Sequence, residues 1–351
     1  FMPAVMGIIA DRWIPAQRLL GLCHLFAAGF ITLAATRTDY NSLYTLVLLS
    51  VMFYMPTIAP SNSVAYNALE KAGLDTVTHF PPIRVWGTVG FICAMWVVDL
   101  GKMGLSATQL YFSATLGLIL GLYSFTLPNC PINRSGGGKS IVDLLGLRAF
   151  ALFKQRKMAI FFIFSMLLGM SLQITNAFAD GYIKSFGDTG IHGAKYLGTF
   201  GVEHSTILIS LSQISETLCI LLIPFFLKRF GIKRVMLIAM FAWVLRFALL
   251  GAGNPGPGVW MFILSMIVYG VAFDFFNISG SLFVEKETSA AIRSSAQGVF
   301  MIMPNGLGAL IGSYLAGWVV NHYGWPLSWY LFAGFSLVVA IVFAVIFKYK
   351  H

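Results

Sequence analysis

The feature that most constrains this chain is a series of apolar segments, each about as long as a bilayer is thick. A helix needs about 20 predominantly apolar residues to cross the hydrocarbon core of a membrane. We expect ten spans of this kind, separated by shorter and more polar stretches, at roughly 18–36, 42–62, 83–100, 107–127, 157–180, 205–227, 232–252, 259–284, 291–319 and 327–347. The pattern predicts an all-α, polytopic integral membrane protein.

The composition supports this class over the soluble alternatives. Hydrophobic residues make up 58% of the chain and charged residues only 10%. Soluble domains contain about 45–50% apolar residues and about 25% charged residues. Much of the apolar surface must therefore face membrane lipid. The formal net charge of +10 raises the possibility of a nucleic-acid partner. However, the basic residues lie between the apolar segments, as they do in the loops of membrane proteins. We therefore predict no nucleic-acid partner.

The cysteines and histidines give no indication of a metal site or a cofactor. The four cysteines are isolated from one another and the six histidines are scattered along the chain, so neither a disulfide framework nor a ligand cluster is expected. A membrane-embedded enzyme is a further possibility, and it would need a nucleophile, base or metal set within the spans. The sequence shows no such converging set within the spans, so it favours a transporter and not an enzyme.

The lysines and arginines indicate the orientation of the chain. Most of the 23 basic residues fall in alternate loops, from Arg12 and Arg18 near the start to Lys348 and Lys350 near the end. Cytoplasmic loops carry an excess of Lys and Arg. We therefore expect the C-terminus to lie in the cytoplasm.

A polar segment at 128–156 divides the chain. It contains two prolines, a Ser-Gly-Gly-Gly run at 135–138 and five basic residues, a composition typical of a linker. We expect a cytoplasmic linker there. It would join an N-terminal helical bundle at 1–127 to a C-terminal six-helix bundle at 157–351.

Two basic turns suggest that the two parts are related. The Gly-x-x-x-Asp-Arg turn that ends in Asp11 and Arg12 resembles the major facilitator signature between the second and third helices, without the usual glycine after the arginine. A comparable turn contains Lys228 and Arg229. Equivalent positions in two six-helix bundles would leave the first helix and half of the second before Phe1. The expected architecture is thus a major facilitator fold with an incomplete N-terminal bundle.

Several polar side chains fall inside the apolar segments. Glu216 and Asp274 lie deep within two of them, and Arg84 lies near the start of another. A charged residue at mid-span costs at least about 2.5–3.5 kcal/mol on insertion scales and usually faces a cavity. Arg246 lies nearer the end of its span, where we expect it to snorkel to the interface or to form a structural pair.

Helical spacing places these groups on faces with other polar and aromatic residues. Residues three, four or seven apart share a helix face, which groups Arg84 with Thr88 and Phe91, Gln173 with Asn176, Gln213 with Glu216, and Tyr269 with Phe273. Asp274 is turned by about 140° from Tyr269. The amides could instead serve as interhelical hydrogen-bonding groups, and the aromatic rings could be packing residues.

These groups suit a polar, uncharged molecule with a flat apolar part. Carboxylate and amide groups bond hydroxyls, aromatic rings offer stacking faces, and an arginine can donate to a carbonyl or ring nitrogen. A nucleoside fits this set, and a plain sugar fits it almost as well.

Six stretches carry a resemblance to a known family: Phe80–Phe91 (FPPIRVWGTVGF), Met158–Gly169 (MAIFFIFSMLLG), Leu172–Asn176 (LQITN), Ser212–Glu216 (SQISE), Tyr269–Gly280 (YGVAFDFFNISG) and Ile292–Gly298 (IRSSAQG). In these stretches the chain closely resembles the bacterial NupG-type permeases, which are nucleoside:proton symporters of the major facilitator superfamily. The resemblance extends over essentially the whole chain.

The resemblance implies alternating-access import of purine and pyrimidine nucleosides with protons across a Gram-negative inner membrane. It also implies the nucleoside contacts Arg84, Thr88, Phe91, Gln173, Asn176, Gln213, Glu216, Tyr269 and Phe273. Asp274 matches the acidic residue of the family's Phe-Asp-Phe-Phe motif and is the candidate for proton coupling. We expect a monomer surrounded by lipid. A proton-coupled sugar or oligosaccharide symporter of the same superfamily is the alternative.

Overall fold

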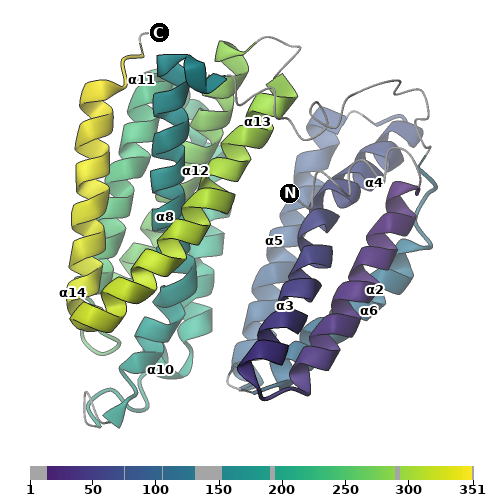
Figure 1. Ribbon diagram of the computed structural model, residues 1–351, viewed down its shortest axis with the longest axis horizontal. Helices are drawn as coiled ribbons and strands as arrows, with labels where there is room; N and C mark the ends of the chain where they lie inside the picture. The colour runs from purple at the N-terminus through teal and green to yellow at the C-terminus, as the bar shows by residue number, and fades with distance from the viewer. Residues whose placement is uncertain are drawn as a thin grey trace. The chain divides into compact units, whose positions relative to one another are not determined.

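The computed structural model describes residues 14–74, 76–104, 106–130, 152–189, 194–288 and 293–349, and over these residues it is helical, without a β-strand. The expected all-α class is confirmed (Figure 1). The chain divides into two compact units, unit 1 at Phe1–Leu145 and unit 2 at Gly146–His351. Most of the predicted linker and the turn at Asp11 and Arg12 lie outside the described residues, so both stay predictions.

Unit 1 is built around its first described helix. Its helices are α2 (Ala16–Ala35), α3 (Tyr40–Tyr54), the short 3₁₀ helix η1 (Met55–Thr57), α4 (Ile58–Lys71), α5 (Thr76–Leu100) and α6 (Thr108–Ser124). Helix α2 packs against α3, α4 and α6. The start of α2 is tied to the chain beyond α6, because the Gln17 side chain bonds Asn129 at 2.5 Å and accepts the Cys130 N–H at 3.0 Å.

Unit 2 is a bundle of long helices with an aromatic core. It consists of α8 (Arg156–Ser185), the short α10 (Phe200–Glu203), α11 (Ser205–Ala252), α12 (Val259–Glu287), α13 (Arg293–Ile302), the π-helical turn η3 (Met303–Gly308) and α14 (Ala309–Ile346). Helix α11 packs against α12 and α14, and α8 packs against α14 and η3. Phe161, Phe162, Phe247 and Trp329 are fully buried in the core.

Two of these helices are each a pair of helices joined by a sharp bend. The backbone turns at Gly231 (φ 75°) in α11 and at Gly324 (φ 72°) in α14. Glycine adopts positive φ readily because it has no Cβ atom to clash with the backbone. The bends explain why two of the expected apolar segments fall at least partly on each of these helices. Each of the ten expected segments overlaps one or more helices in the part of the chain that the structure describes.

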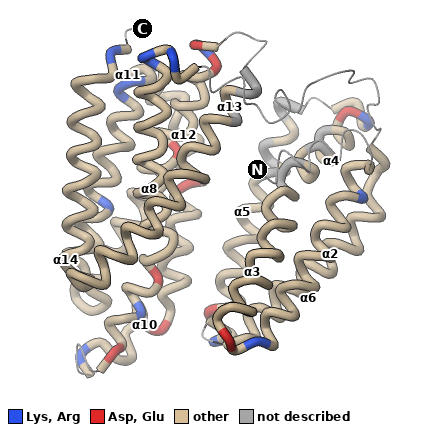
Figure 2. The backbone as a smooth tube through the Cα atoms, in the orientation of Figure 1, with Lys and Arg blue, Asp and Glu red and all other residues tan. Residues whose placement is uncertain are grey.

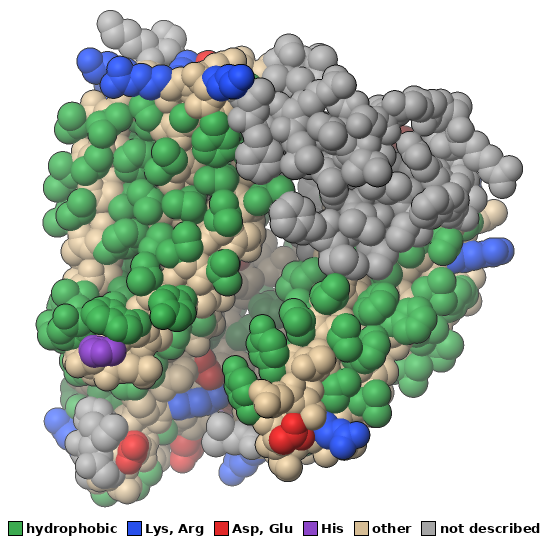
Figure 3. Space-filling model, viewed as in Figure 1, with side chains coloured by type: hydrophobic (Ala, Val, Ile, Leu, Met, Phe, Trp, Pro, Cys, Tyr) green, Lys and Arg blue, Asp and Glu red, His purple; other side chains and the backbone are tan. Residues whose placement is uncertain are grey.

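The surface of unit 2 has the banding of a membrane protein. Six helices within the described ranges, two in unit 1 and four in unit 2, are long and apolar enough to cross a bilayer. Leu221, Leu310 and Tyr314 on these helices are more than 70% exposed, which is unfavourable in water but suits a lipid environment. Most charged residues of the unit lie toward its two ends (Figure 2), and hydrophobic side chains cover the face between them that Figure 3 shows.

Three distant segments are joined at one of these ends. The Lys157 ammonium forms a 2.6 Å ion pair with Glu287 and lies 4.5 Å from the centre of the Tyr349 ring. Burial, together with the nearby Glu287, raises the pKa of the Tyr349 hydroxyl. The start of α8, the end of α12 and the segment that follows α14 therefore meet at one point.

Candidate functional site

The site in unit 2 depends on a close approach of α11 and α12 at Gly270. A Cβ atom at Gly270 would lie 2.6 Å from the Ser215 carbonyl oxygen. The Ser215 hydroxyl donates a hydrogen bond to the Ile267 carbonyl, which fastens the two helices together. Glu216 follows Ser215 and Tyr269 precedes Gly270, so this contact brings their side chains near each other.

Gly270→Ala is expected to destabilise the protein by about 1–3 kcal/mol, the usual cost of overpacking, because the added methyl group meets backbone atoms of α11. Thermal unfolding of the purified protein in detergent measures this loss. The matched control is Gly334→Ala in α14, where a Cβ atom has no neighbour within 4 Å. This control should be neutral or slightly stabilising, since alanine favours helix over glycine. Equal melting temperatures for the two variants would contradict the close-packing argument.

Two carboxyl groups lie near each other across this contact. Asp274 on α12 is only 3% exposed, and its Oδ2 atom is buried without a hydrogen-bond partner in the described residues. Glu216 on α11 is half-buried and close enough to Asp274 to interact with it electrostatically. A buried charge without a compensating bond is costly, and protonation removes that cost. The pair is therefore suited to taking up and releasing a proton.

Aromatic rings line the same region beside the acids. The rings of Tyr269 and Phe273 are stacked 5.9 Å apart at 14°, and Trp243 meets Tyr269 edge-on at 6.0 Å. The Asn176 side chain hydrogen-bonds the Tyr269 hydroxyl, and Glu216 also interacts with that hydroxyl electrostatically. The site thus offers flat apolar faces next to amide, phenol and carboxyl groups.

Arg246 is where the structure departs most from the sequence expectation. It does not snorkel to the interface, because its side chain is only 1% exposed and lies inside unit 2. Its guanidinium donates to the Ser265 carbonyl at 2.6 Å and to the Thr175 hydroxyl at 3.3 Å. It also lies over the Tyr269 ring, 4.6 Å from the ring centre. The expected structural pair exists, but its partners are neutral.

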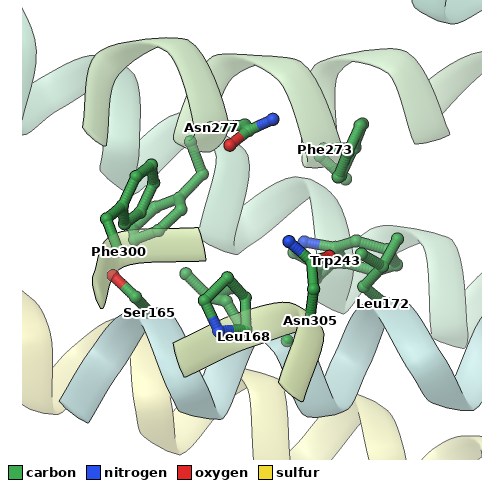
Figure 4. A pocket seen from close by; sticks show the side chains of 12 residues that line it. Ser165, Leu168, Leu172, Trp243, Phe273, Asn277, Phe300 and Asn305 are labelled. Atoms are coloured by element: carbon green, nitrogen blue, oxygen red, sulfur yellow. The ribbon is translucent and has the colours of Figure 1, made fainter. Parts of the chain in front are cut away.

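A small pocket adjoins Phe273 (Figure 4). Phe273 and Asn277 on α12 lie on one side of it and Asn305 on η3 lies on the other. Its volume is about 30 Å³, room for about two water molecules and too little for a nucleobase. Sequence reasoning did not single out Asn305, although the Pro-Asn-Gly run around it interrupts an apolar segment, which is a signal of irregular backbone.

The structure brings together five of the predicted residues and places the others on two units. Asn176, Glu216, Tyr269, Phe273 and Asp274 are linked by the contacts above. Gln173 and Gln213 are half-buried, one helical turn before Asn176 and Glu216. In unit 1, Thr88 and Phe91 lie on α5, where Phe91 is 51% exposed. Arg84 lies on the same helix, and its side chain is outside the described part.

Spanning helices around a buried acid and a polar, aromatic-lined site define this chain as a multi-pass membrane transporter. The family model described as "Nucleoside H+ symporter" matches residues 1–351, and the chain belongs to that family. This membership confirms the predicted class of protein, a transporter and not an enzyme.

Known relatives agree with this assignment. The chain is 51% identical to the nucleoside permease NupG of Escherichia coli, over 100% of this chain and 85% of that protein. It is 50% identical to the E. coli xanthosine permease, over 100% of this chain and 84% of that protein. The crystal structure of an aspartate-to-alanine mutant of the nucleoside transporter NupG matches with a TM-score of 0.94 at 50% identity, over 99% of this chain and 87% of that one. The resemblance to NupG-type nucleoside:proton symporters found in the sequence is thus confirmed.

Proposed function

We propose that this protein imports purine and pyrimidine nucleosides together with protons, by alternating access. The observation that carries the proposal is the juxtaposition of Asp274 and Glu216 with the stacked rings of Tyr269 and Phe273. Asp274 can hold a proton, while Glu216 can bind a ribose and the two rings can bind a base. The names of the two E. coli relatives, a nucleoside permease and a xanthosine permease, support the same class of substrate.

In unit 2, the carboxylate of Glu216 accepts hydrogen bonds from the ribose hydroxyls, with help from the amides of Gln173, Asn176 and Gln213. A carboxylate can accept two such bonds at once, and an amide can both donate and accept. Tyr269 and Phe273 supply the apolar face for the base. In unit 1, we assign Arg84, Thr88 and Phe91 to the nucleoside on the strength of the family resemblance.

Asp274 carries the coupled proton. It is the more deeply buried of the two acids. A carboxyl group in such surroundings exchanges its proton as access to solvent changes. Proton movement through Asp274 and nucleoside binding at Glu216 are linked because the two carboxyl groups interact electrostatically.

We further propose that the protein acts as a monomer in the cytoplasmic membrane of a Gram-negative bacterium, with its C-terminus inside. The support for the orientation of the C-terminus is the basic character of one end of unit 2. There Lys157 lies over the Tyr349 ring, and Lys233 donates to the Ala344 carbonyl at 3.1 Å. Lys and Arg are enriched on the cytoplasmic side of membrane proteins.

The test is uptake by proteoliposomes that contain the protein expressed from its complete gene. Labelled uridine or adenosine should accumulate when the outside is acidic, and excess unlabelled nucleoside should suppress the uptake while free glucose and maltose should not. Liposomes without protein and a collapsed pH gradient are the controls. Competition by free sugars, without competition by nucleosides, would instead identify a sugar symporter.

A further inference from the structure

Arg246 is a buried cation that the proposed mechanism does not use. Within the described ranges, no carboxylate lies within ion-pair distance of it, and its bonds go to the neutral oxygens of Ser265 and Thr175. Two weak contacts join it to the Met266 sulfur at 3.7 Å. An arginine inside the membrane is costly, and such residues are usually retained for function. Packing alone would be served as well by an apolar side chain.

The contacts of Arg246 fix its guanidinium plane in one place. One nitrogen is held by α12 through Ser265, and a second is held by α8 through Thr175. A planar group held at two edges presents its face in a set direction. That face lies 4.6 Å from the centre of the Tyr269 ring.

The opposite end of Tyr269 is the part that faces the polar groups of the site. Its hydroxyl bonds the Asn176 side chain and interacts with Glu216. When the Asn176 amide donates to the phenol oxygen, the phenolic proton is left for another acceptor. A cation over an aromatic ring draws electron density from it, which makes the phenol O–H a stronger donor.

We propose that Arg246 is a positioning residue that orients Tyr269 and strengthens its hydroxyl as a hydrogen-bond donor to the substrate. The inference rests on the proposed function, since the acceptor would be a hydroxyl or carbonyl oxygen of the nucleoside. Arg246 itself stays behind the ring and does not touch the substrate. Thr175 takes part in the same arrangement, because it links the guanidinium to the helix that carries Asn176.

A double-mutant cycle tests this coupling. Arg246→Lys keeps the charge but loses the planar fork, and Tyr269→Phe removes only the hydroxyl. Each single variant should weaken uridine binding to the purified protein by about tenfold, since a lost hydrogen bond of about 1.4 kcal/mol corresponds to that factor. The double variant should be no weaker than the weaker single variant. Arg234→Lys, an exposed position on the same helix α11, is the matched control and should bind normally.

A second readout needs no substrate and so separates this inference from the proposed function. The contribution of Tyr269 to near-ultraviolet circular dichroism is obtained by subtracting the Tyr269→Phe spectrum, in the wild-type and in the Arg246→Lys background. The contribution should change between the two backgrounds, with melting temperatures showing that all variants are folded. An unchanged contribution, or binding losses that multiply in the double variant, would overturn the role of Arg246. Failure of the wild type to bind uridine or adenosine would instead count against the proposed function.

Discussion

Asp274→Asn is expected to abolish the uphill accumulation of nucleoside while leaving nucleoside binding largely intact. Asparagine has nearly the shape of a protonated aspartic acid but cannot exchange a proton. One pH unit across the membrane corresponds to about 1.4 kcal/mol per proton, or about a tenfold concentration ratio. The variant should therefore reduce the inside-to-outside ratio from about 10 to about 1 under that gradient, as measured by labelled uridine in proteoliposomes.

The control for this variant is Asp188→Asn, which changes an exposed acid near the end of α8 and should accumulate nucleoside normally. Counterflow exchange at equal pH on both sides should persist in Asp274→Asn, because it needs binding and access but no net proton movement. Proton-driven accumulation at the wild-type level in Asp274→Asn would remove this residue from the coupling mechanism.

Glu216→Gln is expected to weaken nucleoside binding by about 10- to 100-fold, since hydrogen bonds to a charged group are worth about 1.5–3 kcal/mol. The amide keeps the size of the side chain but loses the charge and one acceptor. Calorimetric titration of the purified protein with uridine measures the effect. Gln213→Ala, one turn earlier on α11, should weaken binding by a smaller factor of about 5 to 10, the value of a neutral hydrogen bond.

Glu203→Gln on α10 is the matched control, because Glu203 is exposed and lies outside the cluster. It should bind uridine with wild-type affinity. Wild-type affinity in both Glu216→Gln and Gln213→Ala would show that the nucleoside does not bind on this face of α11.

The helices could be predicted because the bilayer imposes a length and a polarity on each span. The apolar segments at 205–227 and 232–252 are separated by Lys228 and Arg229, and the structure bends at Gly231 beside them. The i, i+3 spacing also grouped Gln213 with Glu216 on one face. These are local properties, set by the residues themselves and by the period of the helix.

The details of the site could not be predicted in the same way, because they depend on contacts between distant segments. The position of Arg246 along its span suggested an interface, yet Ser265 and Thr175 from two other helices hold it inside the bundle. The pocket beside Phe273 depends on the π-helical turn that carries Asn305. A single sequence shows neither which helices are neighbours nor where a helix changes its winding.

The contact of Lys157 with Glu287 and Tyr349 bears on how motion in this protein can be observed. Because Tyr349 is held against α8 and α12, a fluorophore or spin label attached near it would report the movement of these packed helices of unit 2. The label should leave Tyr349 itself unchanged, since a bulky group at that position would compete with the Lys157 ammonium for the face of the ring.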